Sequence, residues 1–170
     1  MRETMRYGFI LAVICMLAAG LLAGVNALAK EKIISQALAE EKASLKEVFP
    51  QAAAFEPIES DGEVIYYRAL DAQKQLIGAA FKASGKGYSS TIETMAGMLK
   101  NGQITAIKVL AQNETPGLGA RITEPEFTGQ FINKKDLSQV QAITGATISS
   151  KAAIDSVNQK KAQVLRLMQE

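Results

Sequence analysis

An uncharged run near the N-terminus constrains this chain more than any other feature of its sequence. Residues 7–29 contain no acidic or basic side chain, and Asn26 is the one strongly polar member of the run. As an α-helix, these 23 residues would span roughly 34 Å at ~1.5 Å per residue, enough to cross the ~30 Å hydrocarbon layer of a bilayer. We therefore expect a single membrane-spanning helix over residues 7–29.

A cleaved signal peptide is the main alternative for this run, because residues 27–29 (Ala-Leu-Ala) have the small-x-small form of a cleavage site. The run is longer than the usual ~7–15-residue core of a signal peptide, so we expect a retained anchor. A pilin-like start fits less well, since no acidic residue follows Phe9 early in the helix. Two basic residues precede the run and two follow it closely, so charge gives little indication of orientation.

The composition excludes several classes of site. Histidine is absent, which rules out an imidazole acid–base catalyst and a Ser-His dyad. Cys15 is the single cysteine, so this chain alone cannot build a disulfide framework, a zinc site or an iron–sulfur cluster. Any redox chemistry must therefore come from an organic cofactor. The net charge of +2 gives no field that suggests nucleic-acid binding.

Helical patterns flank the rest of the chain. Residues 30–50 are rich in Ala, Glu and Lys, carry apolar residues near helical spacing and end at Pro50, which predicts a connecting helix. We expect a short helix at residues 124–131. Residues 150–168 place their apolar side chains on one side, which predicts a C-terminal helix.

The section between these helices has strand patterns. Residues 63–70 and 76–83 predict one hairpin. Residues 91–99 and 104–111 predict a second, around an Asn-Gly turn. We expect a glycine-bearing loop at residues 85–87. Hairpins between terminal helices indicate an α+β fold: a domain on a largely antiparallel sheet with flanking helices.

Two segments have patterns that suggest chemistry. The first is Thr144-Gly145-Ala146-Thr147-Ile148-Ser149-Ser150, just before the C-terminal helix. Free backbone N–H groups and the positive end of the helix dipole favour a phosphate there. The same residues also fit an ordinary cap, in which Ser149 or Ser150 caps the helix.

The second segment is the loop Glu114-Thr115-Pro116-Gly117-Leu118-Gly119-Ala120-Arg121. Gly117 and Gly119 permit close approach of the backbone to a flat ligand. A rigid Pro-Gly turn explains the same composition equally well.

These segments resemble the signatures of a known family. Thr144-Gly145-Ala146-Thr147 resembles the [Ser/Thr]-Gly-Ala-Thr flavinylation motif of FMN-binding domains. Such domains occur in the G subunit of the Rnf ion-translocating ferredoxin:NAD oxidoreductase and in the C subunit of the sodium-pumping NADH:quinone oxidoreductase. The loop Glu114–Gly119 is similar to a second signature, which lies beside the flavin, and Gly87-Tyr88, opening a strand, also resembles the family. The short length and single anchor are more similar to the Rnf G subunit.

The resemblance implies that Thr147 carries FMN through a phosphoester bond, which a flavin transferase forms from FAD outside the cytoplasm. Thr147 is then a tether, with no catalytic residue and no metal ligand expected. The other residues that it implies at the cofactor are Thr144, Gly145, Ala146, Glu114, Thr115, Gly117, Leu118 and Gly119. Members often have an acid three positions before the first Thr of the motif, where this chain has Gln141 and the nearest upstream acid is Asp136. That departure bears on recognition by the transferase and leaves the acceptor unaffected.

The function implied is that of an electron-carrier subunit without an independent catalytic site. Its partners would be the other membrane, iron–sulfur and flavin subunits of the Rnf complex, the flavin transferase and membrane lipid. Residues 1–6 would be cytoplasmic, residues 7–29 would cross the membrane, and residues 51–170 would form the FMN-binding domain on the periplasmic side. The alternatives are the C subunit named above, another extracytoplasmic flavin carrier, and a membrane-anchored binding module without redox function.

Overall fold

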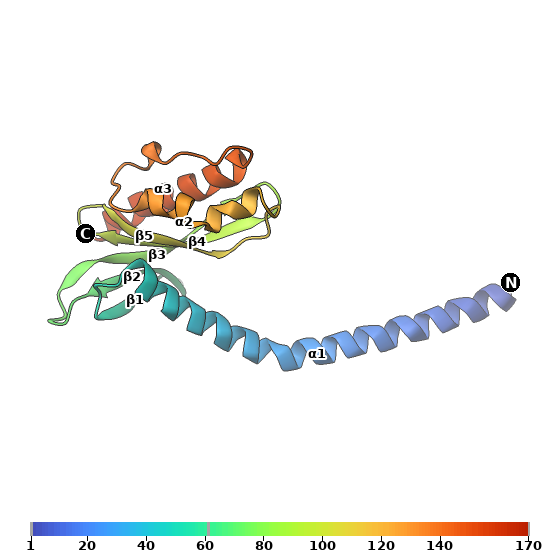
Figure 1. Ribbon diagram of the computed structural model, residues 1–170. Helices are drawn as coiled ribbons and strands as arrows, with labels where there is room; N and C mark the ends of the chain where they lie inside the picture. The colour runs from blue at the N-terminus through green and yellow to red at the C-terminus, as the bar shows by residue number, and fades with distance from the viewer. Residues whose placement is uncertain (1, 61, 170) are drawn as a thin grey trace. The chain divides into compact units, whose positions relative to one another are not determined.

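The computed structural model describes residues 2–60 and 62–169, without the side chains of residues 2, 3, 31 and 34. The chain divides into two compact units, Met1–Glu41 and Lys42–Glu170. Helix makes up the first unit, and a five-stranded antiparallel sheet with helices makes up most of the second (Figure 1). The predicted α+β fold is confirmed.

Helix α1 runs without a break from Arg2 to Val48. It contains an 18-residue window of mean hydropathy 2.5, none of which is buried. By length and composition it is the one described helix that could cross a membrane. The predicted spanning helix and connecting helix are therefore parts of one continuous helix. It ends just before Pro50, as predicted, because a proline disfavours helical backbone in the residue before it.

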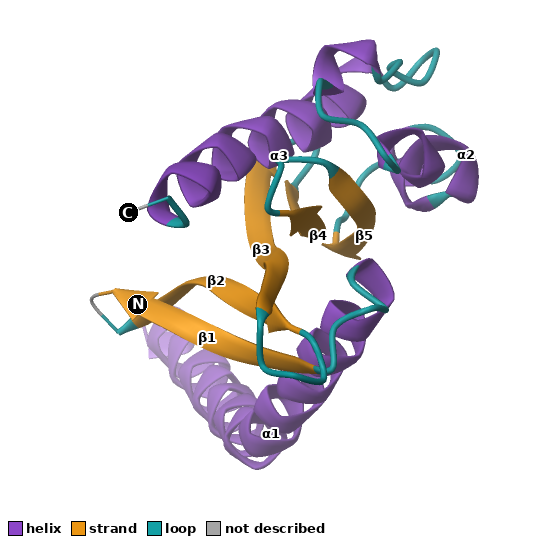
Figure 2. Cartoon of the chain, turned by 90° about the vertical axis from the view of Figure 1, so that its left-hand side faces the viewer, coloured by secondary structure: helices purple, strands orange, loops and turns teal. Residues whose placement is uncertain are grey.

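The five strands form a meander in the order β1-β2-β3-β4-β5, in which each strand pairs with the next along the chain (Figure 2). Their bounds are β1 Ala54–Ser60, β2 Glu63–Leu70, β3 Leu76–Lys86, β4 Thr91–Leu99 and β5 Ile104–Ala111. Both predicted hairpins are confirmed. Strand β1 was not predicted, because Pro57 and two glutamates weaken its strand pattern. Such residues are tolerated there because β1 is an edge strand.

Helices cover one face of the sheet. The longest is α3, Thr147–Leu167, which packs on β3 and β4. The shorter segments are η1 Gly119–Thr123, α2 Pro125–Thr128, η2 Gly129–Phe131 and η3 Leu137–Gln139. The short helix predicted at residues 124–131 is thus present as α2 followed by η2. The predicted C-terminal helix is confirmed but begins at Thr147 rather than at about Ser150.

Two cores lie on opposite faces of the sheet. Phe81 of β3 packs in one core with Phe127, Val157 and other residues of the covering helices. Its neighbour Ala80 faces the other way, because successive strand residues alternate between faces, and packs in the second core with Phe49. This arrangement fixes β3 and β4 beneath α3.

The predicted loop at residues 85–87 is wrong at its first two positions. Gly85 and Lys86 belong to β3, where Gly85 pairs with Ile92 of β4. A Cβ at Gly85 would lie 2.4 Å from the carbonyl oxygen of Ala152 in α3. Glycine at this position therefore allows close approach of the helix to the strand, and the turn comes after it, at residues 87–90.

Candidate functional site

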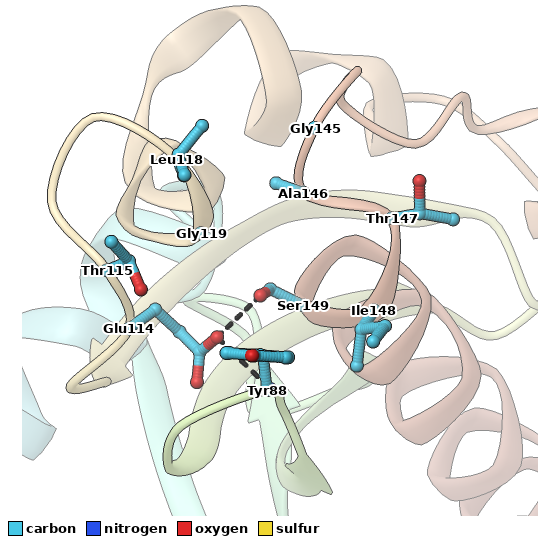
Figure 3. Close-up of a pocket in the computed structure, with 10 residues that line it drawn as sticks. All are labelled: Tyr88, Glu114, Thr115, Leu118, Gly119, Gly145, Ala146, Thr147, Ile148 and Ser149. Carbon is cyan, nitrogen blue, oxygen red and sulfur yellow. Dashed lines mark hydrogen bonds between the residues drawn. The ribbon is translucent and has the colours of Figure 1, made fainter.

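A pocket of about 530 Å³ brings together the two segments that the sequence singled out (Figure 3). Its walls come from the turn between β3 and β4, the loop after β5 and the start of α3. The lining residues are Tyr88, Glu114, Thr115, Leu118, Gly119, Gly145, Ala146, Thr147, Ile148 and Ser149. A volume of this size lies within the ~300–1,000 Å³ that is typical of small-molecule sites.

Helix α3 begins in this pocket at an end that no side chain caps in the described part of the chain. The cap residue is Ala146, and Gly145 before it has a φ of +82°, a conformation that glycine adopts without strain. The first N–H groups of the helix have no partner within the helix, and the positive end of its dipole lies there too. Thr147, the first helical residue, is exposed. This end of the helix therefore suits an anionic group such as a phosphate.

The alternative that Ser149 or Ser150 caps the helix is wrong. Both serines lie within the first turn of α3 and are buried. The Ser150 hydroxyl accepts a hydrogen bond from the N–H of Ile143 at 3.0 Å. The Ser149 hydroxyl donates one to Oε2 of Glu114 at 2.5 Å. The two serines thus tie the start of α3 to neighbouring segments.

Glu114 places an almost completely buried carboxylate, 5% exposed, in the wall of the pocket. Its Oε1 accepts hydrogen bonds from the N–H of Ser89 at 3.0 Å, and from the N–H and hydroxyl of Ser90 at 2.9 and 3.3 Å. Its Oε2 accepts from the N–H of Tyr88 at 3.1 Å and from the Ser149 hydroxyl (Figure 3). The carboxylate therefore joins the β3–β4 turn to helix α3.

These hydrogen bonds determine the charge of Glu114. Burial raises the pKa of its carboxyl group, but hydrogen bonds from Ser149, Ser90, Ser89 and Tyr88 outweigh burial and hold the pKa below its ordinary value of 4.5. Glu114 is consequently ionised at neutral pH and gives the pocket wall a fixed negative charge.

The two glycines of the loop have different structural roles. Gly117 has a φ of +73°, and no atom of the described residues lies within 4 Å of the position that its Cβ would take. Gly119 has the opposite character, because its Cβ would lie 2.7 Å from Ser149 Oγ and 2.9 Å from Glu114 Oε2. Gly117 therefore allows the backbone of the turn to adopt a positive φ, whereas Gly119 allows the loop to pack closely against Ser149 and Glu114.

Seven of the nine residues predicted at the cofactor line the pocket, and Thr144 and Gly117 do not. Tyr88, Ile148 and Ser149 also line it and were missed. Ile148 and Ser149 follow the Thr-Gly-Ala-Thr sequence directly, and Tyr88 belongs to the Gly87-Tyr88 pair that resembles the family. We expected that pair to open a strand, but it lies in the turn between β3 and β4.

Three large side chains at the pocket are exposed despite their apolar surface. Tyr88 is 72%, Leu118 49% and Ile148 56% exposed, and they come from three different segments. Figure 3 shows all three among the residues that line the pocket, with Leu118 on the loop. Together they offer apolar surface to a flat aromatic ligand.

Comparisons with known proteins agree with this geometry. Residues 87–160 match the family model described as FMN-binding domain, and this range includes every residue that lines the pocket. Residues 1–48 match the model described as RnfG N-terminal region, which ends where α1 ends.

Relatives along most of the chain have closely related descriptions. The chain is 38% identical over 135 residues to the G subunit of the ion-translocating oxidoreductase complex of Methanosarcina acetivorans, a match that covers 70% of this chain and 72% of that protein. It is 29% identical over 181 residues to the G subunit of the Na(+)-translocating ferredoxin:NAD(+) oxidoreductase complex of Acetobacterium woodii, covering 90% and 87%. The crystal structure of Shewanella oneidensis NqrC shares the fold, with a TM-score of 0.52 at 17% identity over 71% of this chain and 74% of that one. The chain therefore belongs to the family of G subunits of ion-translocating oxidoreductase complexes.

Proposed function

We propose that this chain is the covalently flavinylated electron-transfer subunit of a membrane-bound, ion-translocating ferredoxin:NAD oxidoreductase of the Rnf type. The pocket carries the proposal, because it lies within the region that matches the FMN-binding model and unites Thr147 with the loop at residues 114–119. The match of residues 1–48 and the relatives' descriptions favour the G subunit over the C subunit of a sodium-pumping NADH:quinone oxidoreductase.

The residues of the pocket suit FMN at both ends of that molecule. The uncapped start of α3 offers backbone N–H donors to the phosphate. Tyr88, Leu118 and Ile148 offer exposed apolar surface to the isoalloxazine ring. The pocket volume of about 530 Å³ is within the range of cofactor sites. We assign Gly145 and Ala146 to the phosphate end, and Thr115 and Leu118 to the ring and ribityl chain. Thr144 and Gly117, which lie outside the pocket lining, would shape the turns that carry these residues.

We assign covalent attachment to the Thr147 hydroxyl, which is exposed at the first position of α3. In this step Thr147 Oγ forms a bond to the FMN phosphorus of FAD, the pyrophosphate bond of FAD breaks, AMP leaves and the hydroxyl proton is released. A flavin transferase would catalyse this step. No oxidation or reduction takes place in it.

Bound FMN would supply the capacity to take up two electrons and pass them on singly, which suits relay between iron–sulfur clusters and other flavins. The residues of this chain would bind the cofactor, orient it and set the polarity around it. Thr147 would serve as a tether, with no independent catalytic site. The electron donor and acceptor, and the ion pathway, would belong to the other subunits.

We propose that α1 is retained as a single-pass membrane anchor in contact with lipid and with the other subunits. Residues 7–29 would span the bilayer, residues 1–6 would lie in the cytoplasm, and the domain formed by residues 51–170 would lie on the periplasmic side. The apolar and unburied character of α1 supports the anchor. The orientation rests on the expectation that the transferase acts after export.

The test is the intact mass of the native protein together with in-gel flavin fluorescence after denaturation. Wild type should be about 438 Da heavier than its sequence, which is FMN minus water, and fluorescent. Thr147→Ala should lose both signals while the domain stays folded. Thr144→Ala is the matched control, with the same change three residues earlier and outside the pocket lining, and should keep the attached flavin.

Flavin fluorescence in denatured Thr147→Ala protein would contradict the assignment of the acceptor. Wild-type protein of unmodified mass, from cells that contain the transferase, would favour the alternative of a membrane-anchored binding module without a redox cofactor.

A further inference from the structure

The buried carboxylate of Glu114 is engaged by protein groups on both oxygens. Among the described residues, five hydrogen bonds reach it, three from backbone N–H groups and two from serine hydroxyls. Their donors lie 24–26 residues before Glu114 in the β3–β4 turn and 35 residues after it in α3. One side chain thus connects all three segments that wall the pocket.

The backbone around this carboxylate leaves space for it on two sides. A Cβ at Gly87 would lie 2.6 Å from Glu114 Oε1, and a Cβ at Gly119 would lie 2.9 Å from Oε2. Any larger residue at either position would collide with the carboxylate. The turn and the loop are therefore both shaped to hold a carboxylate at this place.

We propose that Glu114 is a positioning residue, which latches the first turn of α3 to the pocket wall and presets Thr147 for attachment of the cofactor. The latch runs from Glu114 Oε2 through the Ser149 hydroxyl, two residues along the helix from Thr147. This inference rests on the proposed function for its consequence, but the latch itself is built entirely from residues of this chain.

The chemistry of the site requires a carboxylate rather than its amide. All five partners donate to Glu114, and an ionised carboxylate accepts only. In Glu114→Gln, the amide nitrogen would face either the N–H of Tyr88 or the N–H groups of Ser89 and Ser90. Either orientation sets a donor against a backbone donor, so the latch is weakened without a change of size.

The experiment compares Ser149→Ala and Glu114→Gln with a matched control, Ser156→Ala, in the full-length chain produced without the transferase. Ser156 is also a buried serine of α3, but its hydroxyl bonds within the helix, to the carbonyl of Ala153 at 3.1 Å. Hydrogen–deuterium exchange at residues 150–154 and the rate of FMN attachment on addition of FAD and purified transferase are then measured.

The latch predicts that Ser149→Ala and Glu114→Gln exchange faster at residues 150–154. Both variants should also attach FMN roughly fivefold or more slowly than wild type, as expected for loss of a buried hydrogen bond to a charge. Ser156→Ala should match wild type in both. Unchanged exchange or an unchanged rate in Ser149→Ala and Glu114→Gln would overturn the proposal. A wild type that never gains flavin would contradict the proposed function instead, and the exchange measurement would still decide whether the latch exists.

A further readout separates positioning from general loss of stability. After prolonged loading, Glu114→Gln should have a higher flavin midpoint potential than Ser149→Ala, because only the first substitution removes a negative charge from the pocket wall. Equal potentials would overturn the expectation that the charge of Glu114 acts on the bound ring.

Discussion

Replacing Gly119 with alanine should place a methyl group where the pocket wall has no room for it. The new Cβ would lie 2.7 Å from Ser149 Oγ, 2.8 Å from Glu114 Cβ and 2.9 Å from Glu114 Oε2. Non-bonded carbon contacts are ordinarily ~3.5–4.0 Å, so the loop or the helix must move. Since Ser149 and Glu114 are buried and bonded to each other, movement that relieves the collision also strains their hydrogen bond.

The size of the effect follows from these two contributions. Overpacking of a well-filled site costs about 1–3 kcal/mol. Weakening a buried hydrogen bond to a charged acceptor adds about 1–3 kcal/mol. We expect Gly119→Ala to lower the free energy of unfolding by about 2–6 kcal/mol, a substantial part of the ~5–15 kcal/mol of a typical domain.

Two other glycines provide controls for the same substitution. Gly129 has a φ of −64°, and its Cβ position has no neighbour within 4 Å in the described part of the chain, so Gly129→Ala should stabilise the fold by about 0.4–1 kcal/mol. Gly117 has equally open surroundings but a φ of +73°, so Gly117→Ala should destabilise by about 1–2 kcal/mol through backbone strain alone. The series separates collision, strain and chain entropy.

Urea unfolding of the full-length chain in detergent, followed by tyrosine fluorescence, measures these differences, because the chain has four tyrosines and no tryptophan. The variants must have equal m-values for their midpoints to be compared. A Gly119→Ala variant as stable as Gly129→Ala would refute the packing of the loop against Glu114 and Ser149.

Three further expectations can be checked separately. Glu114→Gln should have a lower free energy of unfolding than wild type at neutral pH, and this difference should shrink as the pH falls below 4.5. The reason is that a carboxyl group whose pKa is lowered by folding stabilises the fold only while it is ionised, so a difference that does not change in acid would contradict the expectation. Thr94→Val should raise the free energy of unfolding by about 1 kcal/mol, since the Thr94 hydroxyl is buried without a hydrogen-bond partner among the described residues; thermal melts that show a loss would oppose it. A reporter fused after residue 170 should be active only outside the cytoplasm, and cytoplasmic activity together with flavin attachment by a transferase confined there would reverse the orientation.

The parts of the fold that the sequence predicted are those where local signals agree with tertiary structure. The strands of the β4–β5 hairpin are rich in apolar residues and flank an Asn-Gly turn, so composition and turn chemistry point the same way. Strand β1 has no such agreement, because its sequence carries Pro57 and acidic residues. It becomes a strand through pairing with β2, a contact that no local pattern encodes.

The site was predictable where a motif was contiguous. Residues 144–147 and 114–119 stand out as short segments, and most of both line one pocket. Tyr88 belongs to the same pocket through the β3–β4 turn, and only the pairing of the strands brings that turn to the other two segments. The start of α3 was placed too late because Ser149 and Ser150 are good capping residues, while the tertiary partners Glu114 and Ile143 engage their hydroxyls instead.

Glycine and glutamate in this site show why residue type alone does not give a role. Gly117 and Gly119 look equivalent in the sequence. Gly117 is needed because its φ is positive, whereas Gly119 is needed because a Cβ there would lie only 2.7 Å from Ser149 Oγ. Glu114, in a loop rich in glycine and proline, would ordinarily be expected to face solvent. It is buried because three backbone N–H groups and two hydroxyls converge on it, and those donors come from segments on both sides of it in the sequence. A buried carboxylate is stable only while its hydrogen-bond donors stay in place. Because these donors belong to two different segments, the ionised Glu114 holds those segments together and also gives the pocket wall its negative charge.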